Sequence, residues 1–355
     1  MKKKWLKRIL ITVVILSLVT VSLVSWTPAI RDSNRQVIEE SIASLEQVSL
    51  GGIEQHILIR GQNKNYPVLL FLHGGPGYPQ ISFARKFQSK LEKDLLVVQW
   101  DQRGSGKSYS RQVPEDSMNR EQFISDTIEL VEYLTLRFNQ EKIYLAGHSW
   151  GSDLGVRAVS KRPDLFYAYI GIGQVVHSEK QEQISYEYVY SMAAADGNKK
   201  ALEDLEEIGF PPYADHEKDV MVQRKWLRRY DGVEVNVNTM REIVLGILFS
   251  PEYTWLDGIR FIRGNYFTRE TMFNDIKDVN MLEDYPVLPV PVYFMAGRQD
   301  YNTPSELVKQ YYNQLDAPIK EFFWFENSAH DPHFEEPEKF AELMGYILNE
   351  TRRSK

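Results

Sequence analysis

The sequence predicts an α/β protein in which a mostly parallel, doubly wound sheet is interrupted by a helical insertion. Short apolar runs alternate with helix-compatible runs, as expected for parallel strands that are buried on both faces. This alternation stops between about Ser178 and Asp284, where the sequence is helical and aromatic, and it resumes at Val290. In the first part, Ser149 lies in a tight turn between an apolar strand and a helix. These observations predict one sheet domain that carries an inserted helical cap.

The composition excludes several classes of function. The chain has 355 residues, of which 43% are hydrophobic, so it is long enough to bury a large core. It contains no cysteine, which excludes disulfides, thiol catalysis and cysteine-ligated metal. Its net charge of −7 argues against a nucleic-acid partner.

The amino terminus differs from the rest of the chain. A basic cluster (Lys2, Lys3, Lys4, Lys7 and Arg8) precedes an uncharged apolar run from Ile9 to Trp26. This pattern predicts an N-terminal hydrophobic helix that anchors the protein in a membrane, with the basic end in the cytoplasm and the remaining chain outside it. A cleaved signal peptide, which would give a secreted protein, is the alternative, but no clean cleavage site follows the run.

The elements before the insertion follow from periodicity and turn residues. Arg31 to Leu45 is polar and compatible with a helical stalk, and Gly51-Gly52 joins two alternating runs as a hairpin. Strands are predicted at Gln47–Leu50, Ile53–Ile59, Val68–Leu72, Leu95–Trp100, Lys142–Ala146 and Ala168–Gly173, and helices at Phe83–Glu92, Asn119–Phe138 and Asp153–Ser160.

Two further strand–helix pairs follow the insertion. Strands are predicted at Val290–Ala296 and Glu321–Phe325, and helices at Pro304–Leu315 and Pro337–Leu348. We therefore divide the chain into an anchor or signal segment, a first core part, a helical cap and a second core part, at residues 1–30, 31–177, 178–285 and 286–355.

The turn at Ser149 fits the G-x-S-x-G pattern through Gly147 and Gly151. A serine in a sharp strand-to-helix turn is held in a strained conformation with its hydroxyl exposed. Glycines are favoured two residues before and after it because little room exists there. The helix that follows directs its positive dipole end toward the serine, where a developing negative charge would be stabilised.

Three residues lie at the carboxyl ends of predicted strands, in the order Ser149, Asp300 and His330. This order is expected for a nucleophile, an orienting acid and a general base on such a sheet. Asp300 as a simple helix cap and His333 as the base are the alternatives. The other histidines are expected to be structural, namely His56, His73, His148, His177 and His216.

A negatively charged intermediate would need two backbone N–H donors. We predict that Trp150, directly after the serine, supplies one and that Gly75 supplies the other, with Gly74 as the alternative. No metal site is predicted, because Pro332 prevents regular helical spacing between His330 and His333. The run Gly104–Ser108 lacks the spacing of a phosphate-binding loop and is expected to be a structural turn.

Four motifs together resemble the proline iminopeptidase branch of the α/β-hydrolases. They are His73-Gly74-Gly75-Pro76-Gly77, Asp101-Gln102-Arg103-Gly104-Ser105-Gly106-Lys107-Ser108, Gly147-His148-Ser149-Trp150-Gly151-Ser152 and Gly297-Arg298-Gln299-Asp300. The resemblance covers roughly Gln47–Leu348 apart from the cap. It implies an α/β-hydrolase fold, a serine hydrolase without a cofactor, Ser149, Asp300 and His330 as the catalytic triad, and a cap that forms the substrate pocket.

The resemblance also implies a substrate class. Members of this branch bind the free amino end of the substrate through acidic cap residues, for which Glu203, Glu206 and Glu207 are candidates here. We expect an aminopeptidase that releases N-terminal residues, proline above all, from small peptides. A carboxylesterase or lactonase acting on a small ester and a non-catalytic binding protein on the same scaffold are the alternatives. The sequence assigns neither substrate-binding residues nor an oligomeric state.

Overall fold

The structure is a computed structural model that describes residues 24–353. Eight strands form one sheet in the order β1-β2-β4-β3-β5-β6-β7-β8. The β1–β2 and β2–β4 pairs are antiparallel, and all other pairs are parallel, which confirms the mostly parallel sheet. The strands are β1 (Ile42–Leu50), β2 (Ile53–Gly61), β3 (Val68–Leu72), β4 (Leu96–Asp101), β5 (Ile143–His148), β6 (Phe166–Ile172), β7 (Val292–Gly297) and β8 (Lys320–Phe325).

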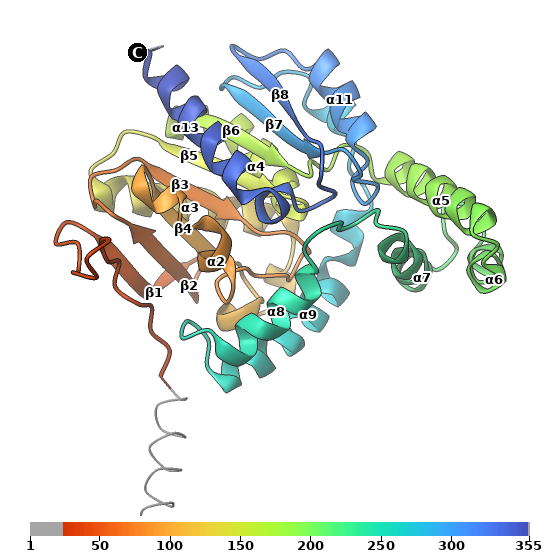
Figure 1. Ribbon diagram of the computed structural model, residues 1–355, viewed down its shortest axis with the longest axis horizontal. Coiled ribbons are helices and arrows are strands. Elements are labelled where there is room, and N and C mark those ends of the chain that lie inside the picture. Colours follow the sequence, from red (N-terminus) through yellow and green to blue (C-terminus); the bar gives the residue numbers. More distant parts are fainter. Residues whose placement is uncertain (1–23, 354–355) are drawn as a thin grey trace, which may run out of the picture.

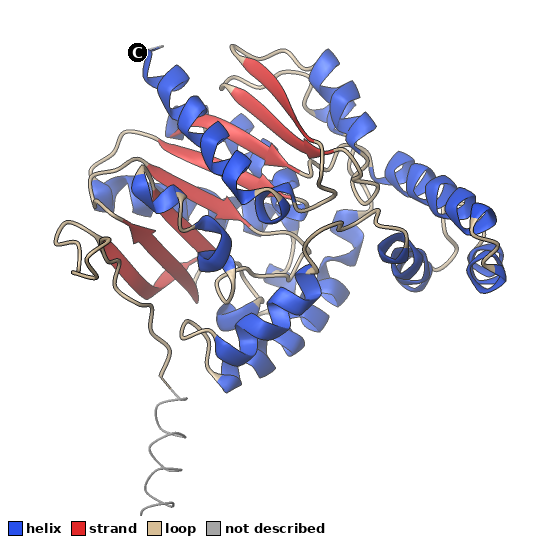
Figure 2. Ribbon diagram, in the orientation of Figure 1, coloured by secondary structure: helices blue, strands red, loops and turns tan. Residues whose placement is uncertain are grey.

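Helices cover both faces of this sheet (Figure 1, Figure 2). Those outside the cap are α2 (Ala84–Gln88), α3 (Arg120–Phe138), α4 (Trp150–Lys161), α11 (Ser305–Gln314), α12 (Pro332–Glu335) and α13 (Pro337–Arg353). Short 3-10 turns are η1 (Leu91–Lys93), η2 (Gly106–Ser108), η3 (Glu115–Ser117) and η4 (Pro163–Leu165).

The strands supply two hydrophobic cores because successive side chains point to opposite faces of a sheet. Leu70 and Leu72 of β3 pack with residues of α3, α4 and α11 on one face. Leu69 and Phe71 of the same strand pack with α13 on the other face. Both cores require apolar residues at every position of β3, which explains its uninterrupted apolar sequence.

Six helices lie between β6 and β7, in the stretch where the helical insertion was predicted. They are α5 (Ser178–Ala195), α6 (Lys199–Ile208), α7 (His216–Arg229), α8 (Thr239–Phe249), α9 (Trp255–Ile276) and α10 (Met281–Asp284). In Figure 1, α5, α6 and α7 extend to one side of the sheet, and α8 and α9 lie beneath its central strands. The division of the chain into separate domains stays a prediction.

The predicted helical stalk from Arg31 to Leu45 is wrong. Its last four residues belong to β1, which pairs with β2 from Ile42↔Gly61 to Leu50↔Ile53, and no helix forms in the rest. Gly51 and Gly52 both have positive φ angles, as a two-residue hairpin turn requires, and this turn fixes the register along the whole edge strand. Pairing with β2 therefore overrides a local composition that is compatible with a helix. The helix predicted at Phe83–Glu92 is also shorter, because α2 ends at Gln88.

The predicted N-terminal hydrophobic helix lies almost wholly outside the described residues. Within residues 24–353, no helix combines the length and the apolar character needed to cross a membrane. Where the described chain begins, the backbone N–H of Trp26 donates a hydrogen bond to the carbonyl of Pro251, between α8 and α9, at 2.9 Å.

A buried ion pair joins the β1–β2 hairpin, α3 and the loop after β4. Both Arg103 and Asp126 are fully buried, with Arg103 Nε 2.8 Å from Asp126 Oδ2 and Nη2 3.0 Å from Oδ1. Arg103 Nη2 also donates to the carbonyl of Gly51 at 2.9 Å. The guanidinium thus ties the hairpin turn to α3.

Arg103→Met should lower the free energy of unfolding by about 3–5 kcal/mol, because it leaves the Asp126 carboxylate buried without its cation. Chemical denaturation of the purified protein measures this loss. Arg162→Met is the matched control, since Arg162 makes ion pairs with Asp164 and Glu132 at the surface and its loss should change stability little. Equal effects of the two substitutions would contradict the structural role of Arg103.

Candidate active site

The turn that carries Ser149 has the strained geometry expected from its sequence. Ser149 stands between β5 and α4 with φ 52° and ψ −124°, a conformation that non-glycine residues rarely adopt. A Cβ atom at Gly147 would collide with the backbone of Gly151, and one at Gly151 would collide with the carbonyl of Leu72 at the end of β3. Both glycines are therefore required by close backbone contacts on either side of the serine.

Backbone hydrogen bonds hold this turn in place. The N–H of Ser149 donates to the carbonyl of Ile172 at the end of β6, at 3.0 Å. The Ser149 carbonyl accepts from the N–H of Ser152 at 2.8 Å and from its hydroxyl at 2.6 Å. The Ser152 hydroxyl in turn accepts from the N–H of Val175 at 2.9 Å. The position of Ser149 is thus tied to two neighbouring strands.

His330 and Asp300 meet at the same edge of the sheet, after β8 and β7. His330 Nδ1 lies 3.0 Å from Asp300 Oδ2, and both side chains are almost completely buried. Asp300 also accepts from the N–H of Asn302 at 2.9 Å and from the N–H and hydroxyl of Thr303, each at 2.8 Å. These donors fix the carboxylate, and the carboxylate orients the imidazole.

The charges around His330 oppose the effect of its burial. Burial alone would lower the pKa of this imidazole, but the carboxylates of Asp300 and Asp331 raise it above its ordinary value. Since Asp300 occupies Nδ1, the nitrogen that remains for proton transfer is Nε2.

A cavity of about 250 Å³ lies between the sheet edge and the cap. Ser149 and His330 both line it. The cap contributes residues of α7, α8 and α9 and of the segment between α7 and α8. The remaining lining residues lie at the end of β5 and in the segments after β3, β7 and β8. The charged lining residues are Arg224, Arg228, Glu234, Arg269 and Asp331.

The loop after β3 brings its glycines next to the serine. Gly74 and Gly75 line the cavity, and a Cβ atom at Gly74 would lie 2.9 Å from the Ser149 Cβ. His73 holds this loop, because its Nδ1 lies 2.8 Å from the Gly74 carbonyl and its Nε2 accepts from the N–H of Gln102 at 3.2 Å. Burial lowers the pKa of His73 to about 4, so the ring is neutral and structural, as predicted. The oxyanion roles of Gly75 and Trp150 stay predictions.

Comparison with known proteins assigns the family. The family described as alpha/beta hydrolase fold matches residues 67–337, more than half of the chain. The chain is 38% identical to the probable aminopeptidase YbaC of Bacillus subtilis, over 86% of this chain and 96% of that protein. The chain belongs to the α/β-hydrolase family, in its proline iminopeptidase-like branch.

Two other similarities agree with this assignment. The proline iminopeptidase of Heyndrickxia coagulans is 24% identical over 80% of this chain and 90% of that protein. The crystal structure of proline iminopeptidase from Mycobacterium smegmatis superposes with a TM-score of 0.60 at 16% identity, covering 88% of this chain and all of that one. The structural similarity concerns the fold alone.

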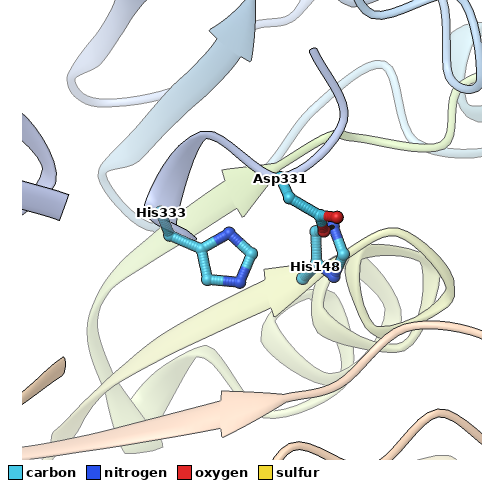
Figure 3. A group of neighbouring side chains, drawn as sticks. All are labelled: His148, Asp331 and His333. Carbon is cyan, nitrogen blue, oxygen red and sulfur yellow. Dashed lines mark ion pairs between the residues drawn. The ribbon is translucent and has the colours of Figure 1, made fainter. Parts of the chain in front are cut away.

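Beside Ser149 and His330, this hydrolase has a buried pair of polar side chains, His148 and Asp331, that the sequence did not predict. His148 Nε2 lies 3.1 Å from both Asp331 Oδ1 and the His330 carbonyl, and Figure 3 shows the His333 ring pointing toward the His148–Asp331 pair. Burial alone would raise the pKa of Asp331, but the hydrogen bond from His148 and the neighbouring histidines hold it well below its ordinary range.

His148, Asp331 and His333 are of types that bind metals, and their ligand atoms lie within 4.8 Å of one another. In this arrangement the His148 ring and the Asp331 carboxylate engage each other, and the second oxygen of Asp331 accepts from the Thr239 hydroxyl at 2.5 Å. The prediction of no metal site therefore stays a prediction, although its argument overlooked the approach of His148.

His333, the alternative base, lies in a different environment from His330. Its ring is fully buried, with its centroid 3.8 Å from that of Phe334 and 4.7 Å from that of His148. Burial lowers the pKa of His333 well below its ordinary value. The histidine that Asp300 orients is His330.

The acidic cap candidates do not reach the cavity. Glu203, Glu206 and Glu207 belong to α6, which contributes no lining residue. Among the described residues, the carboxylates that line the cavity are Glu234 and Asp331. Glu234 follows α7 in an irregular segment, and no periodicity in the sequence could have indicated where that segment points.

The loop after β4 is a structural connection, as predicted. Lys107 Nζ is buried and pairs with Asp257 Oδ2 at 2.7 Å, at the start of α9. Asp101 accepts from the N–H of Lys107 at 2.8 Å and from the Tyr253 hydroxyl, while burial raises the pKa of Asp101 to about 7. This loop thereby joins the sheet to the cap beside the cavity.

Proposed function

We propose that the protein is a serine hydrolase of proline iminopeptidase type, which releases N-terminal residues from small peptides through an acyl-enzyme. The observation that carries the proposal is the 3.0 Å contact between His330 Nδ1 and Asp300 Oδ2, because His330 lines the same cavity as Ser149. The similarity to a probable aminopeptidase and to proline iminopeptidases supports peptides as the substrate class.

In the proposed mechanism, the Ser149 hydroxyl attacks the scissile carbonyl while His330 Nε2 accepts its proton. Asp300 holds the imidazole in the tautomer with a proton on Nδ1 and stabilises the imidazolium. The backbone N–H groups of Trp150 and Gly75 stabilise the oxyanion. His330 returns the proton to the leaving amine, and water then releases the acyl group from Ser149 by the same steps.

We place the ammonium group of the peptide beside Glu234. This carboxylate lines the cavity and is not part of the His148–Asp331 pair. Its Oε2 accepts from the N–H of Thr239 at 2.6 Å, which fixes it at the start of α8. A carboxylate in this position would distinguish a peptide with a free amino end from a neutral ester.

The location of the protein and its division into domains are also proposals. We propose that residues 1–30 hold the protein at a membrane, with the enzyme domain outside the cytoplasm, or direct its secretion if they are cleaved. We propose that residues 178–285 form a cap on a core made from residues 31–177 and 286–355. The helices between β6 and β7 support this division, because α7, α8 and α9 line the cavity above the sheet edge.

Ser149→Ala should abolish labelling by a fluorophosphonate and turnover of a proline arylamide, without loss of folding. His330→Ala should lower kcat/KM on the order of 10⁴-fold or more, because it removes the base. His333→Ala, measured on folded protein, is the matched control and should retain most activity. A larger loss of activity in the His333→Ala variant than in the His330→Ala variant would identify His333 as the base. If the fluorophosphonate did not label the wild-type protein, the alternative of a non-catalytic binding protein would be favoured.

The pH dependence of kcat/KM should show an acid limb with its midpoint above about 6.5, the ordinary histidine value. His330 works as a base only when its imidazole is neutral. Because its pKa is raised, the imidazole becomes protonated at a higher pH, and activity is lost earlier as the medium is acidified. In the Asp300→Asn variant, the acid limb of the residual activity should move to lower pH. The carboxylate that raises the pKa of His330 is then absent, and the lowering of this pKa by burial dominates. A wild-type midpoint at or below the ordinary value would contradict this electrostatic account.

Glu234→Gln should raise KM for a proline arylamide roughly 10-fold or more, since an ion pair in a partly buried site contributes about 1.5–3 kcal/mol. KM for a short-chain aryl ester should stay unchanged. Glu203→Gln, an exposed substitution on α6, is the matched control. If the wild-type protein cleaves only the ester, the alternative of a carboxylesterase or lactonase replaces the peptidase.

A further inference from the structure

The surface of the cap that faces away from the sheet is apolar. We define the outer cap face by exposed residues of α8, of α9 and of the first described segment of the chain, namely Val24, Trp26, Val244, Leu248, Phe249, Trp255, Ile259, Ile262 and Tyr266. The exposed fraction is 64% for Leu248, 76% for Phe249 and 69% for Ile262. Contiguous exposed apolar surface of this kind marks a contact with another molecule or with a membrane.

The same two helices bury their opposite sides. A Cβ atom at Gly246 of α8 would lie 2.8 Å from the Ser82 carbonyl, and one at Gly264 of α9 would lie 2.6 Å from the Gly104 carbonyl. Ile243 and Phe261 are buried between these close contacts. Packing against the sheet domain therefore does not account for the outer residues. These outer residues repeat with helical spacing, at positions 244 and 248 of α8 and at positions 255, 259, 262 and 266 of α9.

The amino-terminal part of the chain meets this face. The Trp26 N–H bonds to the Pro251 carbonyl at 2.9 Å, and a shallow cavity brings Val24 and Trp26 together with Leu248, Trp255 and Ile262. Trp26 is also the last residue of the apolar run that the sequence predicts as a membrane anchor. If this run spans a bilayer, its end at Trp26 brings the bilayer against the outer cap face.

We propose that the outer cap face rests on a lipid bilayer, with its apolar side chains in the interfacial region. The residue types agree with this partner, because Trp26, Trp255 and Tyr266 are the amphipathic aromatics that collect at membrane interfaces. Exposed Arg263 on α9 provides a cation for anionic headgroups, whereas Arg260 pairs with Asp257 at 2.9 Å. The proposal concerns a second membrane contact in addition to the anchor, and it does not depend on the hydrolase assignment.

The absence of cysteine from the sequence allows a direct test on the full chain. Single variants Leu248→Cys and Ile262→Cys carry a polarity-sensitive fluorophore, and the protein is reconstituted in vesicles of phosphatidylethanolamine and phosphatidylglycerol with doxyl-labelled lipid. Leu136→Cys is the matched control, because Leu136 is 86% exposed on α3, near the amino ends of β3 and β5 and opposite the cap. Thermal unfolding verifies that each variant is folded.

We expect blue-shifted emission and strong lipid quenching at positions 248 and 262, since an interfacial helix buries its apolar side about 5–10 Å into the bilayer. Emission at position 136 should be unshifted and unquenched. Quenching at 248 and 262 no greater than at 136 would overturn the proposal. A blue shift without lipid quenching would also overturn the proposal. If dilution of the protein removed that shift, the face would be covered by a second copy of the chain. If dilution left the shift unchanged, the face would be covered by residues 9–23.

A charge placed on the face provides an independent variant. Ile262→Glu in the Leu248→Cys background should reduce lipid quenching at position 248, because a buried carboxylate opposes insertion. Leu136→Glu in the same background should leave the quenching unchanged. Unaltered quenching in the Ile262→Glu variant would mean that the anchor alone sets the distance to the bilayer, and the proposed contact would be rejected.

Discussion

The positive φ angle at Ser149 is the constraint on which the rest of the site depends. A conformation of this kind costs of order 1–3 kcal/mol and persists only where the surroundings enforce it. Here β5, β6 and the end of β3 supply that enforcement through the N–H bond to Ile172 and the close backbone contacts at Gly147 and Gly151. The spacing of the parallel strands therefore determines where the serine hydroxyl lies.

Three buried polar side chains in the loops after β3 and β4 are each held by a partner from another part of the chain. His73 bonds to Gln102, Arg103 pairs with Asp126, and Lys107 pairs with Asp257 of the cap. Burial of such groups is costly unless their hydrogen bonds are made. The glycines of the loop after β4 are only half of its explanation. The other half is that its charged side chains connect the hairpin, the sheet and the cap.

Local patterns predicted the elements whose environment is uniform along their length. The apolar sequence of β3 predicted a strand buried on both faces, and the order Ser149, Asp300, His330 predicted which loops meet at the sheet edge. The first part of the edge strand β1, Ile42–Leu45, was mistaken for a helix because its identity depends on pairing with β2. The approach of His148 to Asp331 and the position of Glu234 in the cavity depend on irregular segments, whose course no local periodicity specifies.

The cap helix α8 connects the two proposals without making one depend on the other. Thr239 and Ile243 line the cavity from its inner side, whereas Val244 and Leu248 belong to the outer cap face. A helix is about 10–12 Å across with its side chains, so a bilayer against the outer face would lie about one helix diameter from the cavity. The close approach of Gly246 to the Ser82 carbonyl holds α8 against the chain that follows β3, so that this one helix separates the cavity from the outer cap face.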